Sequence, residues 1–150
     1  MKVLSSWLHE LLDAPGPIAP EAIADAFDDL GTPVEEETRI GEGLDGVEVV
    51  EVLALRPHPN ADKIQLVDVD RGDGEALQIC CGAFNMAVGD RVPLATLGTV
   101  MPGGLEIARR KLRGEWSNGM LCSARELGLG DDHAGILVLG GEPALGTPIA

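Results

Sequence analysis

The chain has 150 residues, of which 11 are Lys or Arg and 25 are Asp or Glu, so its net charge is −14. This length corresponds to one domain with at most a small appendage, and the apolar content of 45% excludes a disordered chain because it suffices for a hydrophobic core. An acidic chain with no Tyr, two Phe and two Trp is not expected to bind nucleic acid tightly by itself, since its surface repels phosphate and offers few rings for base stacking.

Residues 1–45 are predicted to form a small segment of mostly helical structure, with two basic residues against 11 acidic ones. Ser6 is suited to cap a first helix, and Pro20 is suited to the first turn of a second helix that ends at Gly31. The run from Val34 to Ile40 predicts a strand. A segment of this length buries little apolar surface alone, so we expect an incomplete α+β unit.

Residues 46–150 are predicted to form a second domain made of short strands separated by Gly and Pro. The expected strands are 47–55, 64–69, 76–81, 91–97, 111–113, 120–122 and 136–139, and a helical turn is expected at 123–127. The turn Arg71-Gly72-Asp73-Gly74 joins the second and third strands into a hairpin. The fold class is therefore mainly β with a small α+β N-terminal part, and about five main strands in about 100 residues favour an OB-fold barrel, although a sandwich has the same periodicity.

The cysteines predict a reduced, cytoplasmic chain without a metal centre. Cys80 and Cys81 are adjacent, which strains a disulfide, and no Cys-x-x-Cys pair accompanies Cys122. No run approaches the ~18 apolar residues of a membrane span, and the acidic Glu10 is unlike a signal peptide. A hydrolase that uses Cys81 or Cys122 with His133 is conceivable, but no spacing of nucleophile and base favours it.

The stretch from Arg56 to Lys63 is the most unusual loop of the sequence. Two prolines bracket His58 and impose extended backbone, and Asn60 and Asp62 favour a turn. In an OB barrel this stretch is the loop between the first two strands, which such barrels use for oligonucleotides. It is either a binding loop or a rigid loop without a ligand; no second residue at ligand spacing supports His58 as a metal ligand.

The segment 109–113 is the only basic cluster, with four cations in five residues. Strand alternation around Leu112 places Lys111 and Arg113 on one face, where they suit phosphate contacts or protect a solvated edge strand. The following residues 114–119 predict a turn, in which Trp116 either stacks on a ligand or lies flat on the barrel.

The letters G-x-G-x-x-G at 41–46 precede a strand rather than a helix, so they predict a flexible junction and no dinucleotide site.

Several of these motifs together resemble a known family. They are His58-Pro59-Asn60-Ala61-Asp62-Lys63, Cys81-Gly82-Ala83-x-Asn85, Lys111-Leu112-Arg113-Gly114-x-x-Ser117-x-Gly119-Met120-Leu121-Cys122-Ser123 and Glu126-Leu127-Gly128. This set resembles the tRNA-binding OB domain of aminoacyl-tRNA synthetases. The Cys-Gly-Ala-x-Asn form and the run Asp131-Asp132-His133-x-Gly135-Ile136 are similar to bacterial phenylalanine–tRNA ligase beta subunits in particular.

The resemblance implies that the chain is the N-terminal part of a longer beta subunit and acts as a tRNA-binding accessory to phenylalanine attachment. The implied RNA-binding residues are Asn60, Lys63, Asn85, Arg109, Arg110, Lys111, Arg113 and Ser117. The resemblance also implies a whole enzyme of two alpha and two beta subunits, in which ATP and Mg²⁺ act at the alpha subunit. No catalytic residue and no cofactor is carried over to this fragment, and the RNA contact is expected to be weak and local.

One alternative to RNA binding remains open. The acidic charge and the shortage of aromatic residues also fit a structural or protein-interaction OB module with little intrinsic affinity for RNA.

Overall fold

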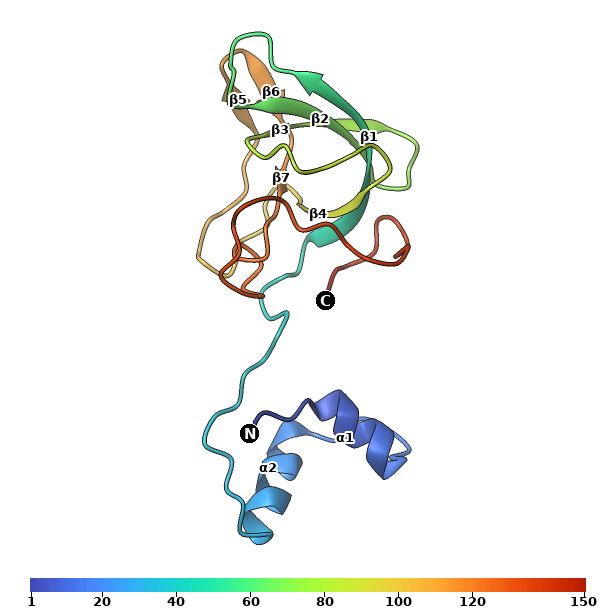
Figure 1. Ribbon diagram of the computed structural model, residues 1–150, viewed down its shortest axis with the longest axis vertical. Helices are drawn as coiled ribbons and strands as arrows, with labels where there is room; N and C mark the ends of the chain where they lie inside the picture. The colour runs from blue at the N-terminus through green and yellow to red at the C-terminus, as the bar shows by residue number, and fades with distance from the viewer. The chain divides into compact units, whose positions relative to one another are not determined.

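The computed structural model describes all residues from 1 to 150 and divides them into two units, residues 1–38 and residues 39–150 (Figure 1). The division expected after residue 45 lies inside the second unit. Leu44 explains the difference, because its side chain is buried in a cluster with Val47 and therefore belongs to the barrel.

The first unit consists of two helices, α1 (Ser5–Leu12) and α2 (Pro20–Asp29). Pro20 occupies the first turn of α2 as predicted, and Gly31 follows its end with a φ of +76°, a conformation that glycine adopts without strain. The prediction for Ser6 is wrong, since Leu4 occupies the cap position of α1 without a side-chain hydrogen bond. Neither helix has the length and apolar character needed to cross a membrane.

The strand predicted between Val34 and Ile40 is absent, because no second strand lies beside this stretch to complete a ladder. Neither helix contains a buried residue. The first unit therefore has two helices but no buried hydrophobic core of its own.

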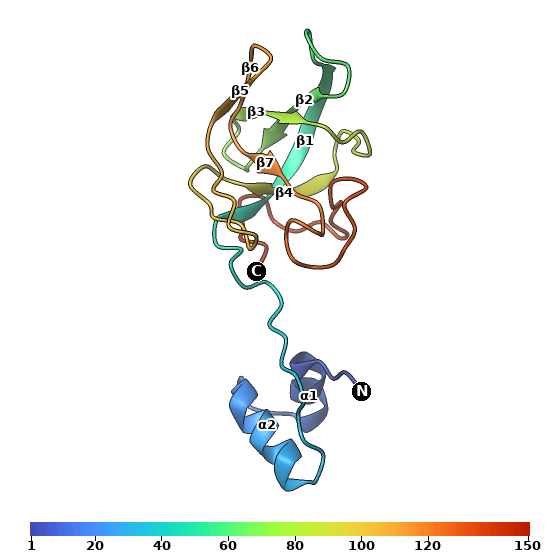
Figure 2. The ribbon, with the colours of Figure 1, turned by 90° about the vertical axis from the view of Figure 1, so that its left-hand side faces the viewer.

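The second unit is a curled β-sheet with a hairpin at one end (Figure 2). Its strands are β1 (Val47–Pro57), β2 (Gln65–Asp70), β3 (Ala76–Cys81), β4 (Arg91–Ala95), β5 (Arg110–Leu112), β6 (Glu115–Ser117) and β7 (Met120–Leu121). Five strands pair in the order β3-β2-β1-β4-β7, and β5 pairs with β6. The first half of β1 pairs with β4 and the second half with β2, and a register shift between Val52 and Ala54 bends the strand so that it serves both partners.

The segment from β6 to β7 closes this sheet into a barrel. At one end, the Asn118 amide donates to the Gln78 carbonyl of β3 at 3.1 Å. At the other end, Leu121 of β7 pairs with Leu94 of β4. The chain therefore bridges β3 and β4, and the predicted OB-type barrel is confirmed.

The barrel interior is filled by β-branched and aliphatic side chains that alternate along the strands, with Val52, Val67, Ile79 and Leu94 fully buried. Residues 136–139, expected to be a strand, instead form isolated backbone hydrogen bonds, such as Leu137 to the Cys122 carbonyl at 3.0 Å. The expected helical turn at 123–127 is present as a single turn, in which the Leu127 amide donates to the Ser123 carbonyl at 3.3 Å.

Candidate nucleic-acid interface

The β5–β6 hairpin turns through two residues, Arg113 and Gly114, with φ values of +47° and +100°. Both values are positive, as a type I′ turn requires. The prediction that Arg113 shares a strand face with Lys111 is therefore wrong, because the chain has already left the strand. Residues Glu115–Ser117, expected to be part of a turn, form β6 instead, since Gly114 allows the reversal within two residues.

Trp116 lies directly opposite Lys111 in this hairpin. The guanidinium carbon of Arg109 is 4.4 Å from the centroid of the Trp116 ring, and the Lys111 Nζ atom is 5.6 Å from it. Both distances are within the range of cation–π attraction. The Trp116 ring therefore contacts two cations, while the residue remains 41% exposed.

The four cations of the hairpin, Arg109, Arg110, Lys111 and Arg113, are exposed and form no ion pair. Elsewhere on the barrel, three Arg side chains are paired with carboxylates, whereas the exposed Arg125 stands alone: Arg56 pairs with Asp68 at 2.8 Å, Arg71 with Glu48, and Arg91 with Glu51 at 3.7 Å. Hydrogen bonds to these acids raise the pKa of Arg56 and of Arg71. The hairpin is thus the place where a cluster of positive charge remains available to an anionic ligand.

The β1–β2 loop is fastened to the hairpin by His58, which is buried. Its Nδ1 atom accepts from the Asn60 amide at 3.0 Å, so Nε2 carries the proton and donates to the Leu112 carbonyl at 2.9 Å. Both ring nitrogens are thereby engaged, which leaves no lone pair for a metal. The Asn60 side-chain amide also donates a hydrogen bond to the Arg113 carbonyl at 3.1 Å. This part of the loop is therefore rigid and continuous with the hairpin.

Two predicted RNA-binding residues, Asn85 and Ser117, make hydrogen bonds within the second unit. The Asn85 side chain donates to the Ile136 carbonyl at 2.9 Å and accepts from the Ile136 amide at 3.0 Å. Ser117 is buried, and its hydroxyl accepts from the Cys80 amide and donates to the Gly119 carbonyl, each at 3.0 Å. Ser117 is therefore not available to RNA in this conformation, whereas Asn85 is exposed and its side-chain amide is engaged by the Ile136 backbone.

Lys63 lies on the β1–β2 loop, exposed and without an ion pair, with its carbonyl facing Gly82. Among the predicted RNA-binding residues, the structure brings together two pairs: Asn60 is hydrogen-bonded to Arg113, and Arg109 and Lys111 contact the same Trp116 ring.

Sequence reasoning missed Gln78, whose Nε2 donates to the Trp116 carbonyl at 3.0 Å and anchors β6 to β3. A single Gln within a strand gives no signal for such a role.

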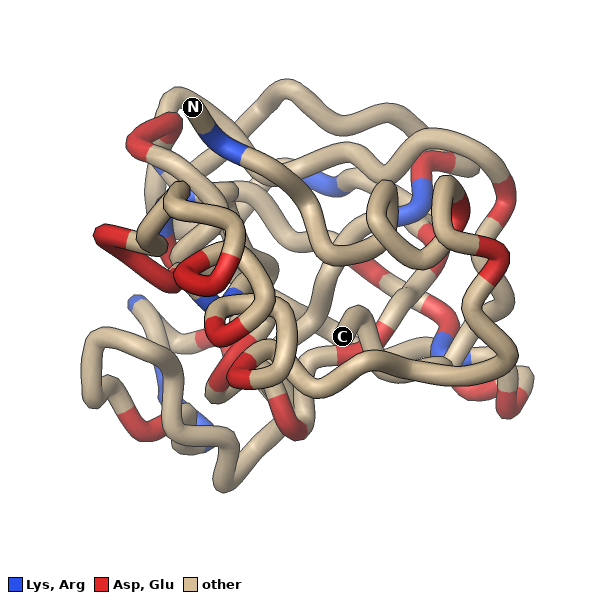
Figure 3. Tube along the Cα trace, turned by 90° about the horizontal axis from the view of Figure 1, so that it is seen from below, with Lys and Arg blue, Asp and Glu red and all other residues tan.

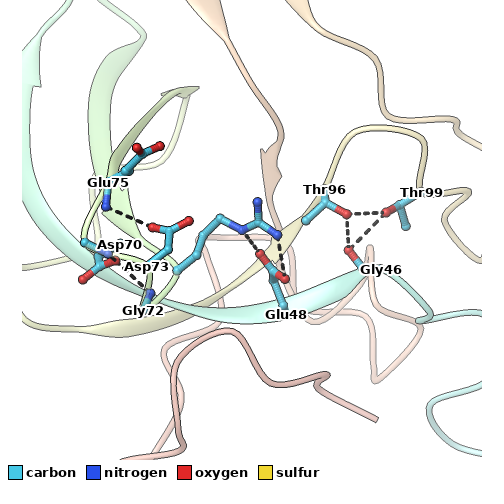
Figure 4. A network of polar contacts seen from close by, with 10 residues as sticks. Gly46, Glu48, Asp70, Gly72, Asp73, Glu75, Thr96 and Thr99 are labelled. Atoms are coloured by element: carbon cyan, nitrogen blue, oxygen red, sulfur yellow. Dashed lines mark hydrogen bonds and ion pairs between the residues drawn. The ribbon is translucent and has the colours of Figure 1, made fainter.

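Acidic side chains of the barrel serve turns and ion pairs rather than a metal centre. Figure 4 shows Asp70 accepting from the Gly72 amide at 2.8 Å and Asp73 accepting from the Glu75 amide at 3.0 Å. In the same view, the Gly46 carbonyl accepts from Thr96 and Thr99 at the start of β1. Acidic residues occur along the whole trace (Figure 3), yet no group of three or more His, Cys, Asp or Glu side chains gathers to hold a metal ion.

The cysteines do not have the environment of nucleophiles. Cys122 is fully buried, and its burial raises the pKa of its thiol to about 12; burial also raises the pKa of Cys81. His133 is exposed and its Nδ1 atom contacts the Asp131 carbonyl. Since the thiolate is the reactive form, the thiol hydrolase considered from the sequence finds no support.

We expect iodoacetamide to leave Cys122 unmodified in the native chain at pH 7.5 and to modify it once the barrel is unfolded. Because its pKa rises from 9.0 to about 12 on folding, the folded state holds the proton more tightly. The stabilisation that the protonated Cys122 thiol contributes is therefore constant below about pH 9 and is lost as the pH rises toward 12. Mass spectrometry of labelled peptides measures the modification of Cys122. Denaturant unfolding of the wild type and Cys122→Ala between pH 8 and about 11 measures the pH dependence of stability. Rapid native labelling of Cys122 contradicts the assignment.

Comparison with known proteins connects this geometry to a family. A family model described as "Putative tRNA binding domain" matches residues 47–148. The chain is 48% identical over 149 residues to the phenylalanine–tRNA ligase beta subunit of Anaeromyxobacter dehalogenans, covering 99% of this chain and 18% of that protein. It is 46% identical over 158 residues to the same subunit of Salinibacter ruber, covering 99% of this chain and 19% of that protein.

The chain thus spans about a fifth of the length of the curated relatives it matches. Among solved structures, a MetRS-related protein from Pyrococcus horikoshii aligns with a TM-score of 0.50 and 18% identity, covering 69% of this chain and 88% of that one. That similarity shows a shared fold.

Proposed function

This chain belongs to the tRNA-binding domain family, and we propose that it binds tRNA through its β5–β6 hairpin as an accessory part of a phenylalanine–tRNA ligase beta subunit. The observation that carries the proposal is the cluster of four exposed cations without ion pairs, Arg109, Arg110, Lys111 and Arg113. Cations on a rigid hairpin suit phosphate oxygens, which position a nucleic acid without reading its sequence. Asn60 on the adjoining loop is hydrogen-bonded to Arg113, and we assign Lys63 of the same loop to this surface.

The net charge of −14 limits the strength of this contact rather than its existence. Of the 25 acidic residues, 11 lie in residues 1–45, so the barrel itself is less acidic than the whole chain. Within a larger enzyme, other domains hold the tRNA and raise the effective concentration at this surface. A weak local contact is then sufficient to orient the tRNA.

The rest of the proposal concerns the whole enzyme. By the names of its relatives, the activity is attachment of phenylalanine to its tRNA. We assign ATP and Mg²⁺ to the alpha subunit of a two-alpha, two-beta enzyme in the cytoplasm. The donor groups of this chain do not fit Mg²⁺, since its carboxylates are dispersed over turns and ion pairs. No step of catalysis is therefore derived from these residues.

The proposal is tested by titrating a phenylalanine tRNA transcript with the full chain at several NaCl concentrations. With about four phosphate contacts, the logarithm of the association constant should fall against the logarithm of salt with a slope of about −3 to −4. Between 50 and 200 mM, this slope amounts to a loss of about 60- to 250-fold in affinity. Absence of binding at 50 mM salt, or a flat response, would favour a protein-interaction module without RNA affinity.

A further inference from the structure

We propose that Trp116 is a positioning residue that presents Arg109 and Lys111 to phosphates of the RNA, and that no base stacks on its ring. This inference rests on the proposed function and adds how the hairpin binds RNA: through the sugar–phosphate backbone, without selecting bases. The starting observation is that one ring holds two neighbouring cations, at 4.4 Å and 5.6 Å from its centroid.

The backbone of Trp116 is held by β5 and by β3. Trp116 is opposite Lys111 in the β5–β6 ladder, which brings their side chains to one face. Its carbonyl accepts from the Gln78 Nε2 atom at 3.0 Å, which ties β6 to β3 of the barrel. The ring therefore projects from a backbone that is tied to the barrel, and Arg109 and Lys111 both contact that ring.

A base that stacked on the ring face covered by the Arg109 guanidinium would have to displace that group, which lies 4.4 Å from the ring centroid. Displacement would give up the cation–π attraction and return a long side chain to many rotamers. Phosphate binding has the opposite effect, because the guanidinium and ammonium donors that do not face the ring remain free for oxygens. The ring also reduces the repulsion between two adjacent positive charges, which have no carboxylate partner.

The experiment compares two ligands that differ only in their bases: a 12-unit uridine oligonucleotide and the corresponding abasic sugar–phosphate oligomer. Trp116→Ala in the full chain should weaken both ligands by the same factor, about threefold to tenfold, with the salt slope nearly unchanged. Trp116→Phe, which keeps a ring under the cations, should recover most of the loss. An equal loss for both ligands excludes base stacking on the ring, and recovery by Phe shows that an aromatic ring at this position is sufficient.

Nuclear magnetic resonance supplies a second readout that does not depend on the stability of the Ala variant. The side-chain protons of Arg109 should be shifted by the ring current of Trp116 in the free chain and should remain so when the uridine oligonucleotide is bound. Loss of that shift on binding would mean that a base has replaced the guanidinium and would overturn the proposal. A Trp7→Phe background leaves Trp116 as the only tryptophan, so base stacking would also appear as strong fluorescence quenching.

The outcomes separate this inference from the function on which it rests. If the wild type fails to bind tRNA at low salt, the proposed function is lost. If the wild type binds but Trp116→Ala weakens only the ligand with bases, or weakens neither, the positioning role is wrong while tRNA binding stands.

Discussion

Replacing all four hairpin cations by glutamine is expected to weaken tRNA binding by about 100- to 1000-fold at ~0.1 M salt, the largest functional effect that this structure predicts. The residues are Arg109, Arg110, Lys111 and Arg113. Each contact with phosphate releases condensed counterions, so loss of about four contacts should also flatten the salt dependence almost completely. Filter binding or fluorescence anisotropy with the phenylalanine tRNA transcript, repeated at four salt concentrations, measures both quantities.

The matched control keeps the four positive charges and replaces the guanidinium groups with ammonium groups. In the variant Arg109→Lys, Arg110→Lys and Arg113→Lys, the slope should remain at about −3 to −4, while affinity falls modestly because Lys lacks the planar donor fork. A second control, Lys2→Gln with Arg71→Gln, makes the chain more acidic at positions outside the hairpin and should change the slope little. If the glutamine variant binds as tightly as the wild type, the hairpin is not the RNA-binding surface.

The barrel was predictable from the sequence because its strands alternate strongly. The runs 47–55 and 76–81 carry regular β-branched or apolar residues between Gly-rich turns, and the structure has β1 and β3 there. The runs 34–40 and 136–139 are also predicted to be strands but form none. A strand needs a partner with free hydrogen-bonding groups, and periodicity contains no information about that partner.

The candidate site was predictable in its charges and not in its geometry. Four cations in five residues are visible in the sequence, whereas the two-residue turn at Arg113 depends on a backbone conformation that Arg rarely adopts. Ser117 and Asn85 looked like hydrogen-bonding groups for a ligand because Ser and Asn are polar. Only the fold shows that the Cys80 amide and the Ile136 backbone already occupy them.

Gly119→Ala should destabilise the barrel by about 2–4 kcal/mol in the free energy of unfolding. Gly119 lies between β6 and β7, with a φ of +156°. An added Cβ atom would lie 2.9 Å from the Ala95 carbonyl oxygen and 2.9 Å from a Leu94 methyl carbon. The oxygen belongs to the backbone of β4, so it cannot move aside without disturbing the pairing of β4 with β7. Denaturant unfolding followed by circular dichroism measures the loss.

Gly103→Ala provides the control, since a Cβ atom there meets nothing within 4 Å and the backbone needs no positive φ. Its stability should stay within about 0.5 kcal/mol of the wild type. If Gly119→Ala is equally harmless, the contact with β4 does not hold the barrel closed. If it is destabilising, amide exchange should accelerate first at Asn118 and Cys80, whose hydrogen bonds join β3 to the closing segment. The hairpin with its cations is joined to that same segment, so tRNA affinity should decline as the closure opens.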